Sequence, residues 1–323
     1  MSYQETQRLR AIEWKRSTST LPDAAKVPAP YIGKDGKPSR REYDVCLPPE
    51  YAHLNLLPEV RDRALELFAE LEIPWHASVN GGPSNHLLSS QVQCVNALTG
   101  MVDDPSGLKA TFGQVLDIGT VEQIEPGRFL TFEYIGPTDF FNEGNGKERV
   151  RGAHCTSVDA AFRHQAPDGR SELVLVEWKY TESYRLRQPD PIRDATRFAR
   201  YGAAIADPSG PIRAGMLPFE LLLDEPIYQL VRQQLLAHAL ERAGVADRVR
   251  VVHVLDPENE AYQRSLHRAE QRALGSTVAE VWSCLLRRYD RFAGIEPRAL
   301  RSGLGSYNVR YAVPSAFVDA DES

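Results

Sequence analysis

The sequence contains 323 residues with a formal net charge of −6, and 42% of its residues are hydrophobic. A chain of this length can bury a sizeable core in one or two domains, and its acidic balance argues against a protein that simply coats nucleic acid. No apolar run approaches the length of about 18 residues that a membrane span needs, and the polar residues 1–16 lack the apolar core of a signal peptide. We therefore expect a cytoplasmic protein without a membrane span.

The cysteines give no indication of a metal cluster or of crosslinks. Cys46, Cys94, Cys155 and Cys284 are far apart in the sequence and form no CxxC pair. This spacing suggests neither a zinc site nor a disulfide framework. We expect thiols in a reducing compartment.

Residues 1–49 are interpreted as an N-terminal extension, followed by one main domain over residues 50–323. Proline and glycine recur between residues 17 and 38, which is typical of irregular chain. The extension also contains Glu13-Trp14-Lys15, a Glu-x-Lys sequence among arginine, serine and threonine residues. Because charged residues usually lie outside, we interpret this sequence as a solvated helix end.

The main domain is predicted to begin with helices and to continue with strands. Residues 58–72 place apolar side chains on one stripe and are predicted to form an amphipathic helix. A second helix is expected over residues 87–98, and a strand over residues 129–135. Glu133 lies in that strand and could project toward a site on the strands that follow it.

Two strands joined by a tight turn carry the most informative pattern. A short apolar run contains Asp159, and a longer one, predicted to be buried on both faces, ends in Glu177-Trp178-Lys179. The Ala-Pro-Asp-Gly sequence at residues 166–169 between them favours a type I turn, so we predict a β-hairpin. Asp159 and Glu177 are each nine residues from Asp168, and antiparallel pairing would place them opposite each other. Lys179 would lie on the same face, because side chains alternate along a strand.

This pair of carboxylates predicts a metal site. Like charges opposite each other destabilise a sheet, and a buried pair costs more unless something neutralises it. Hard cations such as Mg²⁺ bind through one or two carboxylates, phosphate and water. We therefore expect Asp159 and Glu177 to hold Mg²⁺, for which Mn²⁺ could substitute. The alternative is a structural ion pair of Lys179 with Asp159 or Glu177 at a strand end.

The segment after the hairpin is basic. From Tyr184 to Arg200 it contains five arginines and two aspartates. Arg185, Arg187 and Arg193 could bind a DNA backbone, since the arginine fork suits phosphate. A solvated, arginine-rich loop and helix explains these residues equally well.

A helix is predicted to start at Asp224-Glu225-Pro226, with an aspartate cap and a proline in the first turn, and to end at Gly244. Gln229 and Gln233 lie one turn apart on it and could order water at the site or contact DNA. A solvated helix face is the plainer interpretation. Beyond this helix we expect a strand over residues 249–255, a helix over residues 278–286 and a frayed acidic tail over residues 319–323.

The segments around the carboxylates resemble the PD-(D/E)xK nuclease superfamily, and within it a group of restriction endonucleases. Residues 157–163, Ser-Val-Asp-Ala-Ala-Phe-Arg, and residues 176–184 carry the likeness. The resemblance implies an α/β fold with a restriction-endonuclease-like αβββαβ core, in which a mixed sheet is flanked by helices. A C-terminal helical elaboration would follow this core.

Two positions depart from the superfamily pattern. Val158 stands where the superfamily's name expects proline, and the acidic residue often supplied by an upstream helix has no clear equivalent. The helix over residues 87–98 offers Gln91 and Gln93 instead. Whether one or two metal ions bind is therefore open.

The resemblance implies a Mg²⁺-dependent DNA endonuclease that acts in restriction or another defence against invading DNA. Asp159 and Glu177 would hold one or two ions, and Lys179 would orient or activate the attacking water. A homodimer and a partner methyltransferase or other defence proteins would fit this role. The alternatives are a non-catalytic DNA-binding module on a degenerate nuclease fold and a different hydrolase, such as a glycosidase with two close carboxylates.

Overall fold

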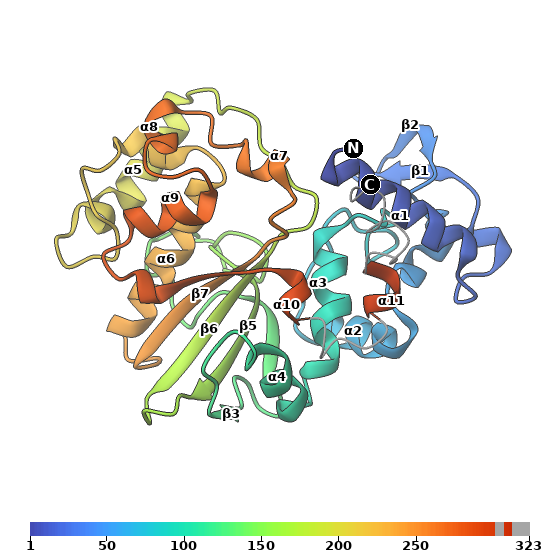
Figure 1. Ribbon diagram of the computed structural model, residues 1–323, viewed down its shortest axis with the longest axis horizontal. Helices are drawn as coiled ribbons and strands as arrows, with labels where there is room; N and C mark the ends of the chain where they lie inside the picture. The colour runs from blue at the N-terminus through green and yellow to red at the C-terminus, as the bar shows by residue number, and fades with distance from the viewer. Residues whose placement is uncertain (301–306, 312–323) are drawn as a thin grey trace, which may run out of the picture.

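The computed structural model describes residues 1–300 and 307–311, so the expected acidic tail lies outside the described residues. At its centre is a six-stranded mixed sheet (Figure 1). The strands are β3 (Thr120–Glu122), β4 (Leu130–Tyr134), β5 (Val158–Gln165), β6 (Ser171–Trp178), β7 (Arg248–Val254) and β8 (Phe292–Ile295). Their order is β3-β5-β6-β7-β8, and β4 also pairs with β5. Pairing is antiparallel from β3 and β4 through β5 to β6 and parallel from β6 through β7 to β8. The predicted mixed sheet is confirmed.

The hairpin of β5 and β6 has the predicted register. Its turn is closed by a hydrogen bond from Gly169 N to Ala166 O at 2.9 Å, and Gly169 has a φ of +82°, which glycine adopts without strain. Six consecutive pairs of β5 and β6 residues then follow without a shift. Continued by one step, this register places Asp159 opposite Glu177.

Helices cover both faces of the sheet (Figure 1). One face packs against α2 (Pro58–Glu70), α3 (Ser90–Leu98) and α4 (Pro105–Phe112). The other face packs against α5 (Pro191–Ala206), α6 (Ile227–Arg242) and α9 (Val278–Leu285). In β6, Val174 and Val176 belong to the first layer, and Leu173 and Leu175 belong to the second. The prediction that this strand is buried on both faces is confirmed.

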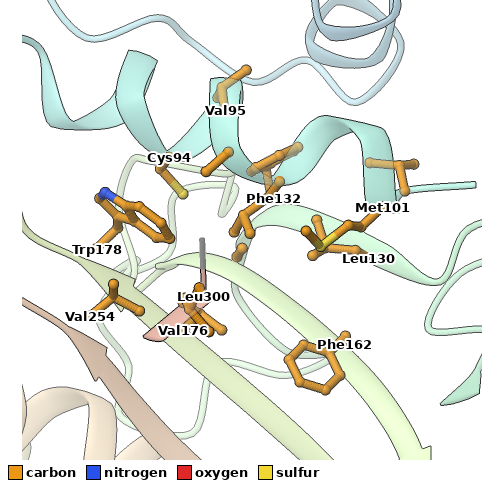
Figure 2. Packing of buried hydrophobic residues seen from close by; sticks show 14 of the residues in the cluster. Cys94, Val95, Met101, Leu130, Phe132, Phe162, Val176, Trp178, Val254 and Leu300 are labelled. Carbon is orange, nitrogen blue, oxygen red and sulfur yellow. The ribbon is translucent and has the colours of Figure 1, made fainter. Parts of the chain in front are cut away.

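Figure 2 shows part of the first layer, where Val176 and Trp178 of β6 lie near Cys94 of α3 and Phe132 of β4. Trp178 separates Glu177 from Lys179, and its indole Nε1 donates to Gln93 Oε1 at 2.8 Å. The core thus fixes the strand segment that carries both charged residues.

The start of α6 differs from the prediction. Its capping residue is Pro226, without a side-chain cap. The Asp224 carboxylate is buried and accepts hydrogen bonds from Arg187 Nε at 3.2 Å and Arg268 Nε at 2.8 Å. The predicted aspartate cap was wrong because two guanidinium groups from other segments hold this carboxylate. Gly244 follows the end of the helix with a φ of +69°, as predicted.

The C-terminal part adds short helices. They are α7 (Glu260–Gln263), α8 (Ala269–Arg272), α10 (Pro297–Leu300) and α11 (Tyr307–Tyr311). Over residues 1–300 and 307–311, every helix lacks the length or the apolar character that crossing a membrane requires. All four cysteines are free thiols.

The N-terminal residues contain regular structure. They form α1 (Tyr3–Ser17) and an antiparallel pair of strands, β1 (Ala29–Ile32) and β2 (Pro38–Tyr43). The prediction of irregular chain was wrong for the strands. Pro30 and Pro38 are tolerated because a two-stranded sheet consists only of edge strands, where a missing N–H is harmless.

Lys15 is buried in this N-terminal region. Only 1% of the residue is exposed, and its Nζ donates to the carbonyl oxygens of Val27, Asp44 and Cys46 at 2.7, 3.0 and 2.6 Å. The interpretation of this lysine as part of a solvated helix end was therefore wrong. Three carbonyls from separate segments converge on one ammonium group, which the local sequence does not reveal.

We expect Lys15→Met to lower the free energy of unfolding by about 2 to 4 kcal/mol, because three buried carbonyl groups lose their charged donor. Urea denaturation of the variant measures this change. Lys37→Met is the matched control at an exposed lysine and should change stability by less than about 0.5 kcal/mol. Equal stability of the two variants would contradict the structural role of Lys15.

Helix α11 packs beside α1 (Figure 1), and its Tyr307 ring lies edge-on to Trp178 of β6 with centroids 6.3 Å apart. The Arg310 guanidinium donates to the backbone and side-chain oxygens of Asn55 at 2.5 Å and lies 4.2 Å above the ring of Trp14. The next residue, Tyr311, packs edge-on against Tyr180 with ring centroids 5.9 Å apart. The residues around Lys179 therefore depend on packing from α11.

Candidate active site

Four ionisable side chains lie in a row across one end of the sheet, one on each of four neighbouring strands. Glu177 of β6 pairs with His253 of β7. The register of the hairpin continues from Glu177 to Asp159 of β5. The pairs on either side of Glu133 in β4 place it opposite Asp159. The predicted residues Glu133, Asp159 and Glu177 are thus neighbours, and Lys179 follows just beyond the end of β6.

Glu177 and Lys179 form a buried ion pair. Glu177 is 2% exposed and Lys179 is 6% exposed, and Lys179 Nζ lies 2.6 Å from Glu177 Oε1. Burial opposes the charge on Lys179, but the Glu177 carboxylate and neighbouring acidic groups raise its pKa well above the usual value. Lys179 is therefore a cation in this arrangement.

Two amide side chains from α6 hold the Glu177 carboxylate. Gln229 Nε2 donates to the oxygen that also contacts Lys179, and Gln233 Nε2 donates to the other oxygen. The predicted accessory residues Gln229 and Gln233 therefore belong to the site, and the interpretation of a solvated helix face was wrong. Glu177 is fixed in orientation by three donors.

Asp159 and Glu133 line a cleft, whereas Glu177 and Lys179 lie buried behind its described lining residues. Asp159 Oδ2 accepts a hydrogen bond from the backbone N–H of Trp178 at 2.7 Å. Glu133 accepts one from Ser157 Oγ at 2.7 Å and one from Gln91 Nε2 at 3.3 Å. The predicted accessory residue Gln91 thus contacts the row through Glu133.

The environment raises the pKa of both carboxyl groups. For Asp159, burial is the main cause, the negative charge of Glu177 adds to it, and Lys179 opposes it. Burial is also the main cause for Glu133, with a contribution from Glu177 against hydrogen bonds from Ser157 and Gln91. Three carboxylates therefore share one low-dielectric region with a single neutralising lysine.

This set of groups fits a hard divalent cation. Carboxylate oxygens are the ligands that Mg²⁺ takes, and its charge would oppose both the burial and the repulsion that raise these pKa values. Among the described residues, no three His, Cys, Asp or Glu side chains are arranged as a metal-ligand cluster. An ion at this place would therefore depend on two protein carboxylates, Asp159 and Glu177, with water and phosphate oxygens as further ligands.

The cleft has a volume of about 600 Å³. Its walls come from Glu133 and Asp159 of the row, from α3 with the loop before it, from residues 181–182 after β6, and from Tyr31 and Tyr43 of the N-terminal strands. His86 also lines it, and burial lowers the pKa of this histidine to about 4. The described residues that line the cleft include no lysine and no arginine. Any phosphate that enters it would therefore meet no fixed positive side chain on the walls.

The three arginines considered for DNA binding lie elsewhere. Arg187 forms ion pairs with Asp194 at 2.8 Å and Asp224 at 3.2 Å, which tie the start of α5 to the segment before α6. Arg193 is exposed and pairs with the capping aspartate of its own helix at 3.3 Å. Arg185 is exposed. The structure does not bring these three side chains into the cleft.

Sequence reasoning missed His253. This residue is buried, and its Nε2 lies 3.1 Å from the hydroxyl oxygen of Tyr262. Burial and the nearby charge of Lys179 lower the pKa of His253 to about 3, so the ring is neutral. The available signal was a histidine near the end of a valine-rich strand, Val-Arg-Val-Val-His-Val-Leu.

A family model described as restriction endonuclease associating with ARP matches residues 8–312. No curated protein and no solved structure matches the chain. The matched range includes most of α1, the whole six-stranded sheet with Glu133, Asp159 and Glu177, and α11. It confirms the resemblance to restriction endonucleases, and the mixed sheet flanked by helices is the fold that this resemblance implies. The chain therefore belongs to the family of restriction endonucleases associating with ARP.

Proposed function

We propose that this restriction endonuclease is a Mg²⁺-dependent DNA endonuclease that hydrolyses phosphodiester bonds of invading DNA. The row of carboxylates supports this proposal most strongly. When ionised, Glu133, Asp159 and Glu177 would carry more negative charge than Lys179 neutralises, and burial together with this repulsion raises the pKa values of Asp159 and Glu133. Closely placed carboxyl groups with perturbed pKa values often mark a functional site, and a bound cation would stabilise their ionised form.

Each residue would have a distinct task. Bound Mg²⁺, which Mn²⁺ could replace, would neutralise non-bridging phosphate oxygens, polarise the attacking water and stabilise the leaving oxygen. Asp159 and Glu177 would hold it, and Gln229 and Gln233 would keep the Glu177 oxygens in place. Lys179 would orient the water, and its ammonium group would lose its proton more readily beside a cation.

A partner protein fits this proposal. The family description names association with ARP, and we propose that this chain also acts together with such a partner. A homodimer would supply the second site that a double-strand cut at one position needs. A methyltransferase or other defence proteins would protect the DNA of the cell.

One observation favours a second candidate, a DNA-binding module without catalysis. Both oxygens of Glu177 already accept hydrogen bonds, from Lys179, Gln229 and Gln233. The carboxylate is thus satisfied by protein donors alone. A module that only binds DNA would retain this arrangement and take up no metal.

Cleavage of plasmid and phage DNA, both unmodified and modified, tests the proposed function. We expect cutting with Mg²⁺ or Mn²⁺, none with EDTA, and none by the Asp159→Asn variant. Calorimetry with each metal on the same protein separates the two candidates. Absence of both cutting and metal binding would favour the binding module.

A further inference from the structure

A second pocket, of about 430 Å³, contains a concentration of basic and aromatic side chains. We call it the basic pocket. Its lining comprises Lys147, Arg200, Arg232, Tyr201, Tyr228, Glu143, Gly144, Asn145, His154 and Cys155. These residues come from the loop before β5, from α5 and from α6.

The basic pocket and the cleft lie on either side of the chain that leads into β5. Thr156 donates to Glu143 and accepts from Arg232, and both of these residues line the basic pocket. The next residue, Ser157, donates to Glu133, which lines the cleft. Consecutive residues thus connect the two sites, and Asp159 lies two residues after Ser157.

The basic side chains of this pocket have no carboxylate partner. In the part of the chain that the structure describes, Lys147, Arg200 and Arg232 form no ion pair, whereas Arg187 and Arg193 of the neighbouring segment do. Glu143 is the one acidic residue among the described lining residues. Its oxygens accept hydrogen bonds from Thr156 and from the Tyr201 hydroxyl. The described lining therefore holds three basic side chains against one acidic side chain. Burial raises the pKa of nearby Glu225, and the charge of Arg232 opposes this rise.

Arg232 has a buried donor, its Nε, without a hydrogen-bond partner among the described residues. Its Nη1 donates to Thr156 Oγ1 at 3.3 Å, and its guanidinium lies 5.2 Å from the centroid of the Tyr228 ring. A buried N–H without an acceptor costs free energy. A phosphate would supply oxygens in the geometry that a guanidinium fork prefers.

We propose that the basic pocket binds a phosphate of the DNA backbone and so positions the strand for the carboxylate row. This inference rests on the proposed function, because it takes DNA as the substrate. The described lining of the cleft contains no lysine or arginine to contact the DNA backbone, so we look for these positive side chains next to the cleft. Arg232 lies on α6 within one turn, roughly 5 Å, of Gln229 and Gln233, which hold Glu177.

Binding of a DNA duplex to the full chain with Asp159→Asn, measured in EDTA, tests the proposal without cleavage. Adding Lys147→Gln and Arg200→Gln should raise Kd about 10-fold at moderate salt and reduce the salt-dependence slope by about 1 to 2. The matched control adds Lys37→Gln and Arg264→Gln, which remove the same charge from exposed residues away from the pocket. Its Kd should change by less than about 2-fold. Equal loss of affinity in the two variants would overturn the proposal.

Cys155 gives a second readout that also identifies the source of the phosphate. It lines the basic pocket, and Cys284, which lies elsewhere and is also part-buried, is the internal control. Burial raises the pKa of the Cys155 thiol to about 11, so alkylation is followed at alkaline pH by mass spectrometry. A DNA duplex should slow the alkylation of Cys155 several-fold and leave Cys284 unchanged.

Inorganic phosphate and a mononucleotide are the comparison probes. Protection of Cys155 by either of them at the concentration at which the duplex protects would overturn the assignment to DNA in favour of a free phosphorylated ligand. Failure of the proposed function is distinguishable from failure of this inference. If DNA protects Cys155 in a protein that does not cut DNA, the proposed phosphate binding by the basic pocket is supported and the proposed nuclease function is not. If the protein cuts DNA but the Lys147→Gln and Arg200→Gln substitutions do not change DNA affinity, only the proposal for the basic pocket is overturned.

Discussion

Replacing Asp159 by asparagine is expected to slow metal-dependent DNA cleavage by about 1,000-fold, which corresponds to about 4 kcal/mol of lost transition-state stabilisation. The asparagine side chain is isosteric with aspartate and keeps an oxygen for the hydrogen bond from Trp178 N, so the fold should persist. The loss would follow from the missing charge at the place where the metal ion would be held. Initial rates on plasmid DNA, with circular dichroism of the same sample, measure both properties.

The same substitution should change the pH dependence of stability. The pKa of Asp159 in the folded state is raised well above its unfolded value of about 3.9. Between these values the folded state binds more protons than the unfolded state, so the free energy of unfolding falls as the pH rises through this range. In EDTA, Asp159→Asn should weaken this fall and be at least as stable as the unmodified protein at neutral pH. Lower stability there would show that the carboxylate is a structural partner.

Removing the buried cation should have the largest effect on stability. We expect Lys179→Met to lower the free energy of unfolding by about 3 to 5 kcal/mol, because it leaves the Glu177 carboxylate buried without a counter-charge. Adding Glu177→Gln to the same chain should recover most of this loss. Urea denaturation of the single and double variants measures the coupling. Arg264→Met breaks an exposed ion pair with Glu260 and should cost less than about 1 kcal/mol.

The Lys179→Met, Glu177→Gln double variant also tests whether this ion pair serves stability alone or takes part in catalysis. If Glu177 and Lys179 served stability alone, the folded double variant would still cut DNA. We expect it to be inactive although it is folded. Cleavage at the unmodified rate would refute the assignment of both residues to the active site.

The hairpin could be predicted because its determinants are local. A turn sequence and two alternating strands fix the register within about 20 residues of chain, and that register was sufficient to place Asp159 opposite Glu177. For Glu133, the sequence suggested only that the side chain could project toward the site, and not that it lies opposite Asp159. A long loop separates β4 from β5, and no local signal fixes the register between them.

The roles of residues whose partners come from distant segments could not be predicted from the local sequence. Asp224 looked like a helix cap because its local sequence suits one, but Arg187 and Arg268 bind it in the folded chain. Lys15 looked solvated because its neighbours are polar, but three backbone carbonyls surround it. In both cases a long-range interaction replaced the local preference.

The position of α11 determines when the site can be completed during translation. Tyr311 packs beside Tyr180, next to Lys179, and Arg310 fastens the segment around Asn55 to α1. The hairpin with its carboxylates leaves the ribosome long before these residues do, since synthesis proceeds from the N-terminus. A nascent chain therefore carries the acidic residues before it has the packing of α11 beside Tyr180. This packing forms only after residue 311 has emerged from the ribosome.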